Sequence, residues 1–328
     1  MNISKFVKND SILSIQVDKN GDAWFDIFTS DYFAIIDKNI MHTSIPEGNY
    51  QICAKAFKKL SKKNTTWDIK NEHFIMSSDG CTLAISRNGP CIHRRVKGHN
   101  TPIPNDFIPE LKLMASVNKD KTMFTSAYAY VLWTDDKLVS TDGATMVVRK
   151  VKYDCPLDIN ISARMIDHLE EDKDYTLFSM LYRKDKKTSF DVRGFECDDY
   201  YFVVNEMLDK FPNWKHIANS KFEHTESIDL DLSELETVNP EWFYRNALYG
   251  SFVNVLDKPA AKGIDVKLKI PADLDIAPVQ FKIKYLLLLW EIMNKKKCSV
   301  LISYSEPNKC YKFSVNNTDV YIMPMIVA

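Results

Sequence analysis

The sequence predicts an α+β protein built from three units of similar size. Short segments in which apolar and polar residues alternate recur along the whole chain, whereas few segments have helical periodicity. The 328 residues, 45% of them hydrophobic, suffice for two or three domains with their own cores. Division into thirds gives the predicted domains 1–100, 101–220 and 221–328.

Alternation bounded by turn residues places the predicted strands. Asn20-Gly21 and Asp79-Gly80 are pairs typical of tight hairpins. Strands are expected at 12–17, 23–28, 32–37, 73–77 and 82–86, then at 123–127, 130–134, 138–140, 145–151, 175–182, 188–192 and 200–204, and last at 299–304, 311–315 and 320–323.

Helical periodicity predicts helices at 50–63, 106–117 and 283–297, one capped by Ser162 and one begun by Asn239 and Pro240. The first has the clearest pattern, because its lysines fall within an arc of ~140° on a helical projection. Cys53, Phe57 and Leu60 lie on the opposite side. Five ammonium groups on one face suit a surface that meets phosphates, although a merely solvated face has the same pattern. The lysines are Lys55, Lys58, Lys59, Lys62 and Lys63.

Composition excludes several classes of protein. The 9 glycines form no GxGxxG, GxxxxGK[ST] or GxSxG motif, which argues against most ATPases, dehydrogenases and α/β-hydrolases. The 7 cysteines are never in CxxC, so reduced thiols in the core are expected. Because 43 Lys+Arg stand against 44 Asp+Glu, only local basic patches can favour nucleic acid. No apolar run approaches the ~20 residues of a membrane span, and a cytoplasmic protein is expected.

Three segments share motifs with one known family. Residues 138–146 (Leu-Val-Ser-Thr-Asp-Gly-Ala-Thr-Met) form a strand and turn, residues 209–217 contain Phe-Pro-Asn-Trp, and residues 320–325 end in Met-Pro-Met. In this order they resemble the middle-domain turn, the link to the last domain and the C-terminal strand of the bacterial β sliding clamp. That family is the processivity subunit of replicative DNA polymerase.

The resemblance implies the DNA-clamp fold, in which three similar domains pack helices on curved antiparallel sheets and two chains close head to tail into a ring. It also implies a function as a sliding clamp, without catalysis or cofactor, in the cytoplasm at the nucleoid or replisome. The implied partners are duplex DNA, DNA polymerase, other replication or repair proteins and a clamp loader. The lysine helix would face the DNA and contact phosphates without reading bases.

The family's functional site is a hydrophobic groove between the middle and last domains that binds short linear peptides. Methionine and proline there provide an adaptable apolar surface for Leu or Phe anchors. The residues carried over by position are Thr141, Gly143, Ala144, Thr145 and Met146 in one wall, Pro212 and Ile217 in the floor, Tyr321, Met323, Pro324 and Met325 opposite, and Tyr128 as a gapped match.

The chain also departs from the family. Ala144-Thr145-Met146 stand where the family usually has His-Arg-Leu, so the preferred partner motif can differ. About ten residues precede the first predicted strand, which implies a trimmed first helix. Such trimming fits a clamp of a phage or other mobile element, which would act in the host cytoplasm.

Other interpretations remain open at this stage. A clamp-like interaction module could keep the peptide site without closing into a ring. A metal-dependent enzyme could use Cys91, His93 and His99, although their spacing is not a standard zinc pattern. Asp142 could also form an acid–base pair with His168 or His216, but aspartate before glycine is more often a turn former.

Overall fold

The computed structural model divides the chain into two compact units. The first comprises Met1–Glu110 and Asn160–Asp209, and the second comprises Leu111–Ile159 and Lys210–Ala328. Both units therefore contain residues of the predicted middle domain, and the division into three domains stays a prediction. The described residues are 3–7, 11–28, 33–38, 41–60, 67–70, 73–76, 81–84, 86–87, 96–118, 127–183, 189–204, 211–237, 250–252, 279–281, 283–305 and 309–323.

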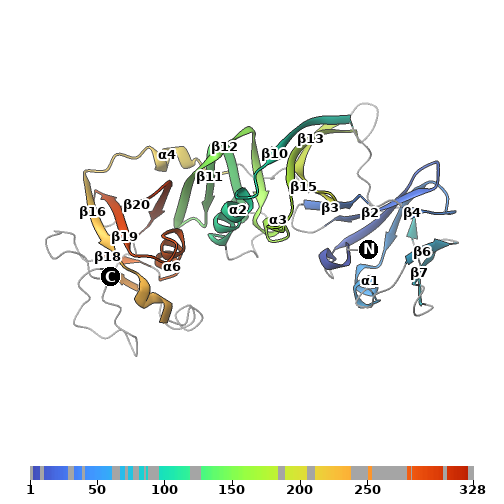
Figure 1. The fold of residues 1–328 in the computed structure, drawn as a ribbon, viewed down its shortest axis with the longest axis horizontal. Coiled ribbons are helices and arrows are strands. Elements are labelled where there is room, and N and C mark those ends of the chain that lie inside the picture. Colours follow the sequence, from blue (N-terminus) through green and yellow to red (C-terminus); the bar gives the residue numbers. More distant parts are fainter. Residues whose placement is uncertain are drawn as a thin grey trace. The chain divides into compact units, whose positions relative to one another are not determined.

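A ten-stranded sheet dominates the first unit (Figure 1). Its strands are β1 (Ile12–Val17), β2 (Asp22–Phe28), β3 (Phe33–Asp37), β4 (Met41–His42), β5 (Gly48–Ile52), β9 (Ser86–Arg87), β10 (Val96–Ile103), β13 (Tyr175–Arg183), β14 (Ser189–Glu196) and β15 (Tyr200–Val204). They run in the order β10-β13-β14-β15-β3-β2-β1-β5-β9, with β4 on β2. The antiparallel β15–β3 pair, with Phe202 opposite Ile35, joins strands from the predicted first and middle domains.

Smaller elements complete the first unit. Phe6 is 3% exposed and packs edge-on against Tyr200 and Phe202, with ring centroids 5.0 and 5.7 Å away. The 3₁₀ turn that carries Phe6 thus contributes to the core of this unit. The elements are η1 (Ile3–Phe6), α1 (Ala54–Leu60), α3 (Ala163–Ile166) and a three-stranded sheet of β6 (Trp67–Lys70), β7 (His73–Met76) and β8 (Cys81–Ala84).

A six-stranded sheet organises the second unit. Its strands are β11 (Tyr130–Thr141), β12 (Thr145–Ser162), β16 (His224–Leu230), β19 (Cys298–Tyr304), β20 (Tyr311–Val315) and β21 (Thr318–Ile322), in the order β11-β12-β21-β20-β19-β16. β12 pairs with β21, so the predicted middle and last domains share this sheet. Also present are η2 (Ala127–Ala129), α4 (Trp214–Ala218), η3 (Ser233–Thr237), α6 (Ile283–Ile292) and the pair β17 (Gly250–Phe252) and β18 (Val279–Phe281), while α2 (Phe107–Ser116) spans the boundary between the units.

The six-stranded sheet is covered differently on its two faces. Phe281, just before α6, packs its ring 5.3 Å from that of Tyr311 and 5.8 Å from that of Phe313. Successive strand residues point to opposite faces. Tyr321 accordingly packs on the other face, where Trp214 at the start of α4 covers it.

Three sequence predictions of local structure are corrected. Tyr50–Ile52, expected to be helical, belongs to β5, and α1 begins only at Ala54. α6 ends at Ile292 and not at residue 297, because Asn294 and Lys295 adopt positive φ angles of 56° and 55°. Ser162 precedes α3 without a side-chain capping bond. The segments expected at 130–134 and 138–140 both fall within β11, and Asp135 between them adopts a positive φ of 48°. The helix expected at Asn239 and the strand residues 123–126 lie outside the described residues.

Two expectations from composition can be compared with the structure. Of the described cysteines, Cys155 and Cys197 are buried as predicted, whereas Cys53 is exposed, which contradicts its expected place on the apolar side of α1. None of the helices in the described part of the chain is long and apolar enough to span a bilayer.

Candidate functional site

The turn between β11 and β12 is held by its own side chains. Thr141 Oγ1 donates to Thr145 O at 2.7 Å and accepts the N–H of Gly143 at 3.1 Å. Asp142 Oδ1 accepts the N–H groups of Ala144 and Thr145 at 3.1 and 2.9 Å. Gly143 has a φ of 89°, and a Cβ there would lie 3.3 Å from Tyr128 Cζ. The turn therefore needs glycine and brings Tyr128 against it.

The C-terminal strand runs beside this turn. Met146 pairs with Tyr321 and Thr145 with Ile322 in the β12–β21 ladder. One residue further, the N–H of Met323 donates to Ala144 O at 2.9 Å. The structure thus brings together the turn and the chain end that the sequence placed on opposite sides of one site.

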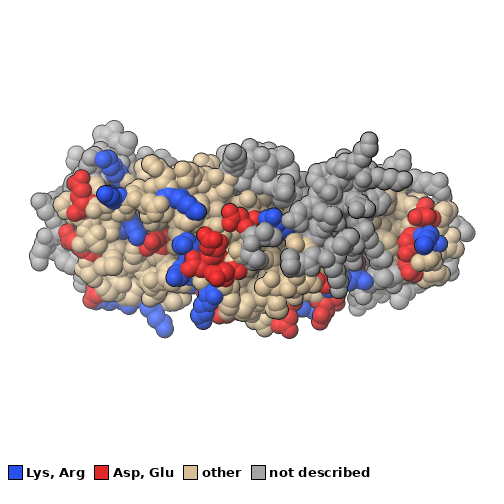
Figure 2. All heavy atoms as spheres, turned by 90° about the horizontal axis from the view of Figure 1, so that it is seen from above, with Lys and Arg blue, Asp and Glu red and all other residues tan. Residues whose placement is uncertain are grey.

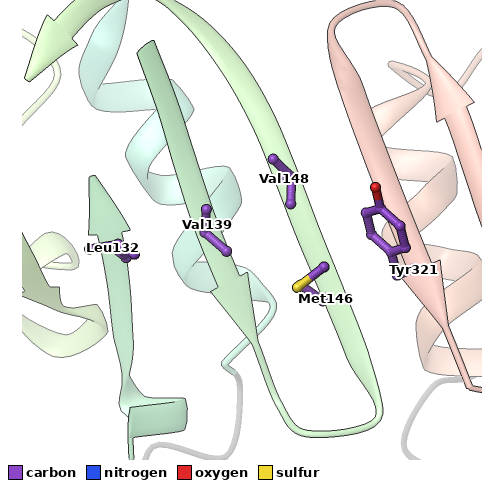
Figure 3. Packing of buried hydrophobic residues seen from close by; sticks show 5 residues of the cluster. All are labelled: Leu132, Val139, Met146, Val148 and Tyr321. Carbon is purple, nitrogen blue, oxygen red and sulfur yellow. The ribbon is translucent and has the colours of Figure 1, made fainter. Parts of the chain in front are cut away.

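An apolar cluster lies on the sheet face that carries Met146 and Tyr321. In Figure 3 these side chains project from the adjacent strands β12 and β21, with α6 visible behind the sheet. Partly buried side chains of the segment 211–222 pack against them. The buried members are Leu132, Val139, Met146, Val148 and Tyr321, and the partly buried ones are Phe211, Trp214, Ala218, Phe222 and Cys310.

Apolar exposure is concentrated near this cluster. Among the described residues, five large hydrophobic side chains are exposed, and three of them are predicted site residues: Tyr128 at 42%, Ile217 at 38% and Met323 at 45%. The other two are Ile12 and Leu301. Water-exposed apolar groups beside a packed apolar cluster are typical of a protein-binding surface.

The link residues have different positions. Pro212 is half-buried, and its carbonyl accepts the N–H of Trp214 at 2.6 Å as α4 begins. Thr145 lies on the opposite face from Met146, because the two are neighbours on a strand, so its backbone and not its side chain borders the cluster. Pro324 and Met325 lie outside the described residues.

Sequence reasoning missed Phe211 and Trp214 as members of the site. Both stand in the Phe-Pro-Asn-Trp segment, and only its proline was assigned to the site. Large aromatic residues in a short connecting segment were the available signal, since such rings usually anchor a link to a core.

Cations border the aromatic residues of the cluster. Lys215 Nζ lies 5.6 Å from the Trp214 ring centroid, and Lys312 Nζ lies 5.8 Å from that of Tyr321. Burial, with the neighbouring Asp319 carboxylate, raises the pKa of the Tyr321 phenol, and burial raises the pKa of the Cys310 thiol to about 11. Both groups are therefore neutral near pH 7.

The lysine helix is shorter than predicted but amphipathic. α1 buries Ala54 and Phe57, which are 6% and 0% exposed, and presents Lys55 to solvent. Lys58 and Lys59 lie within α1, whereas Lys62 and Lys63 lie outside the described residues. On the face seen in Figure 2, basic and acidic side chains of the described residues are interspersed.

The enzyme interpretations gain no support. Within the described residues no cluster of three His, Cys, Asp or Glu side chains could hold a metal ion. Cys91 and His93 lie outside these residues, and His99 is in β10. Asp142 contacts Lys284 Nζ at 2.6 Å and the Tyr285 hydroxyl at 3.0 Å, in addition to the turn amides. Its carboxylate acts as a turn former.

Comparison with known proteins defines the fold. The chain is similar to the Helicobacter pylori β clamp bound to a DNA ligase peptide, with a TM-score of 0.66 and 12% identity over 99% of this chain and 97% of that one. The Thermotoga maritima DNA polymerase III β subunit gives 0.63 and 13% over 99% and 94%. A Pseudomonas aeruginosa sliding clamp with ligand gives 0.65 and 12% over 99% and 95%.

The fold of this chain is thus that of the bacterial β sliding clamps. It is an α+β clamp fold, as the sequence motifs predicted, with antiparallel sheets and few helices. No family model matches the sequence, and no curated protein matches it.

Proposed function

We propose that this protein is a DNA sliding clamp, a polymerase processivity factor that encircles duplex DNA. The observation that carries the proposal is the similarity of 99% of the chain to bacterial β clamps of nearly the same length. In this proposal the chain has three clamp domains, at 1–100, 101–220 and 221–328. It closes head to tail with a second copy into a ring. Its role is to tether other proteins and not to catalyse a reaction.

The proposed peptide site is the apolar cluster and its exposed rim. Met146 and Tyr321 form the base, and Tyr128, Ile217 and Met323 present exposed apolar groups around it. One clamp of the same fold has been crystallised with a DNA ligase peptide. DNA polymerase and other replication or repair proteins would dock here through short motifs with apolar anchors.

The proposed DNA-facing surface is α1 with the lysines that follow it. Lys55 is exposed on the side away from buried Phe57. A net charge of −1 gives no bulk attraction to DNA, so a local row of ammonium groups would supply non-specific phosphate contacts that permit sliding. A clamp loader would open the ring, and the protein would act in the cytoplasm at the replisome. If a phage encodes the chain, this is the cytoplasm of the host cell.

Retention on DNA without ends tests this function. Protein loaded on nicked circular DNA by its loader is expected to stay bound in high salt, since a ring is held by topology and not by charge. Cutting the DNA once should release it, because a sliding ring leaves through the ends. Equal loss from circular and linear DNA would favour a clamp-like module that does not close.

A further inference from the structure

Two side chains at the start of α6 hold the β11–β12 turn. Lys284 Nζ lies 2.6 Å from Asp142 Oδ2, and the Tyr285 hydroxyl donates to the same oxygen at 3.0 Å. These residues are 142 and 143 positions apart in the chain from Asp142. A contact over such a distance joins the predicted last domain to the turn of the predicted middle domain.

The same carboxylate organises the turn. Its Oδ1 accepts the N–H groups of Ala144 and Thr145 while Oδ2 meets Lys284 and Tyr285. The Asp142 side chain is only 17% exposed, whereas that of Lys284 is 43% exposed. One carboxylate therefore ties the backbone of the turn to α6.

The β11–β12 turn contacts two exposed apolar residues. Ala144 O accepts the Met323 N–H at 2.9 Å, and Gly143 lies against the ring of Tyr128. Movement of the turn would change the spacing of Tyr128 and Met323 around Met146.

We propose that Lys284 and Tyr285 are positioning residues that set the width of the peptide site through Asp142. This inference rests on the proposed function of the cluster as a peptide site. Neither residue needs to touch the peptide, since both act through the turn. The link lets α6 control how tightly partners bind.

The energetics favour a link that persists near neutral pH. Burial opposes the charge of Lys284, but its hydrogen bond and attraction to Asp142 prevail and raise its pKa above the ordinary 10.5. A raised lysine pKa stabilises the fold fully below the unfolded value and loses its effect only as pH rises through the folded value. Burial, followed by the Asp142 charge, also raises the pKa of Tyr285, which remains a donor.

Matched variants of the whole chain test the proposal. Lys284→Gln removes the ammonium charge, Tyr285→Phe removes one hydroxyl, and the double variant removes the charge and the hydroxyl together. Lys284→Arg keeps the charge and should restore the link. Lys295→Gln is the control. Lys295 lies just beyond the other end of α6, and its Nζ pairs with Glu291 Oε1 at 3.1 Å.

Two measurements are made on each variant: hydrogen exchange of the Ala144 and Thr145 amides, and affinity for a labelled synthetic peptide with Leu and Phe anchors. In the double variant we expect exchange at least about tenfold faster and peptide affinity about tenfold weaker. Lys284→Arg and Lys295→Gln should stay within about twofold of wild type. Raised salt should lower the peptide affinity of the wild type toward that of Lys284→Gln.

The outcomes are distinguishable. Unchanged exchange and affinity in the double variant would overturn the inference, and faster exchange with unchanged affinity would reduce the link to a purely structural role and overturn it too. If the wild type binds no peptide with such anchors while exchange responds as expected, the proposed peptide-binding function has failed and the link from α6 to the turn has not.

Discussion

Replacing Met323 with alanine is expected to weaken binding of a partner peptide by about 2 kcal/mol or more, roughly 30-fold. Met323 is 45% exposed and its backbone is fixed to Ala144, so its side chain is free to close over an anchor. Apolar groups that become fully buried when a partner binds usually carry most of such an interface's energy. Calorimetric titration of a polymerase peptide against both proteins measures the loss.

Leu301→Ala is the matched control for Met323→Ala. Leu301 is 47% exposed on β19 of the same sheet and is not part of the apolar cluster. It should leave affinity within about twofold of wild type, since surface changes away from such features have small effects. Equal affinities of the wild type and Met323→Ala would show that the chain end does not form part of the site.

Changing Lys55, Lys58, Lys59 and Lys62 to glutamate is expected to abolish productive contact with DNA while leaving the fold intact. The slope of log affinity against log salt is negative, and each lost phosphate contact should make it shallower by about 0.9. Four lost contacts should therefore reduce its magnitude by roughly 3 or more. The fold should survive because α1 is anchored by Phe57, which is fully buried. Affinity for duplex DNA over a salt series measures the slope.

A second quadruple variant separates position from net charge. Lys150, Lys152, Lys215 and Lys221 are exposed lysines of the second unit. Replacing them with glutamate changes the net charge by the same amount but should leave the slope near that of the wild type. If both quadruple variants lose affinity equally, α1 has no special role and its lysines are only a solvated face.

Strands were predictable because alternation and turn chemistry are local. Ile12–Val17 and Tyr311–Val315 occur where they were expected. Gly21 has the positive φ of 80° that the Asn20-Gly21 turn requires. The errors occurred where distant contacts override local pattern. Tyr50, 1% exposed, pairs with Ile15 and so extends β5 into the expected helix.

The polar run in β11 shows the same limit. Asp135 to Lys137 interrupts the apolar alternation, and Asp135 adopts a positive φ of 48° within β11. Asp136 pairs with Lys137 and with Lys150 of β12, at 3.0 and 3.2 Å, so the charges bridge the strands. A cross-strand ion pair leaves no trace in a local pattern.

The site was predictable only in part. The Asp-Gly turn and the chain end were found because they carry family-like motifs, and the structure places them side by side. The contact of Lys284 with Asp142 could not be found, because it joins residues 142 positions apart and no motif marks Lys284.

The molar mass of the protein in solution tests most directly whether it is a ring-forming clamp. Light scattering at micromolar concentration should give a value near twice the 37.9 kDa of one chain, because two chains of three domains complete the proposed ring. A mass near three times that value would point to another closed stoichiometry and contradict the dimer. A strict monomer at all accessible concentrations would contradict the ring itself.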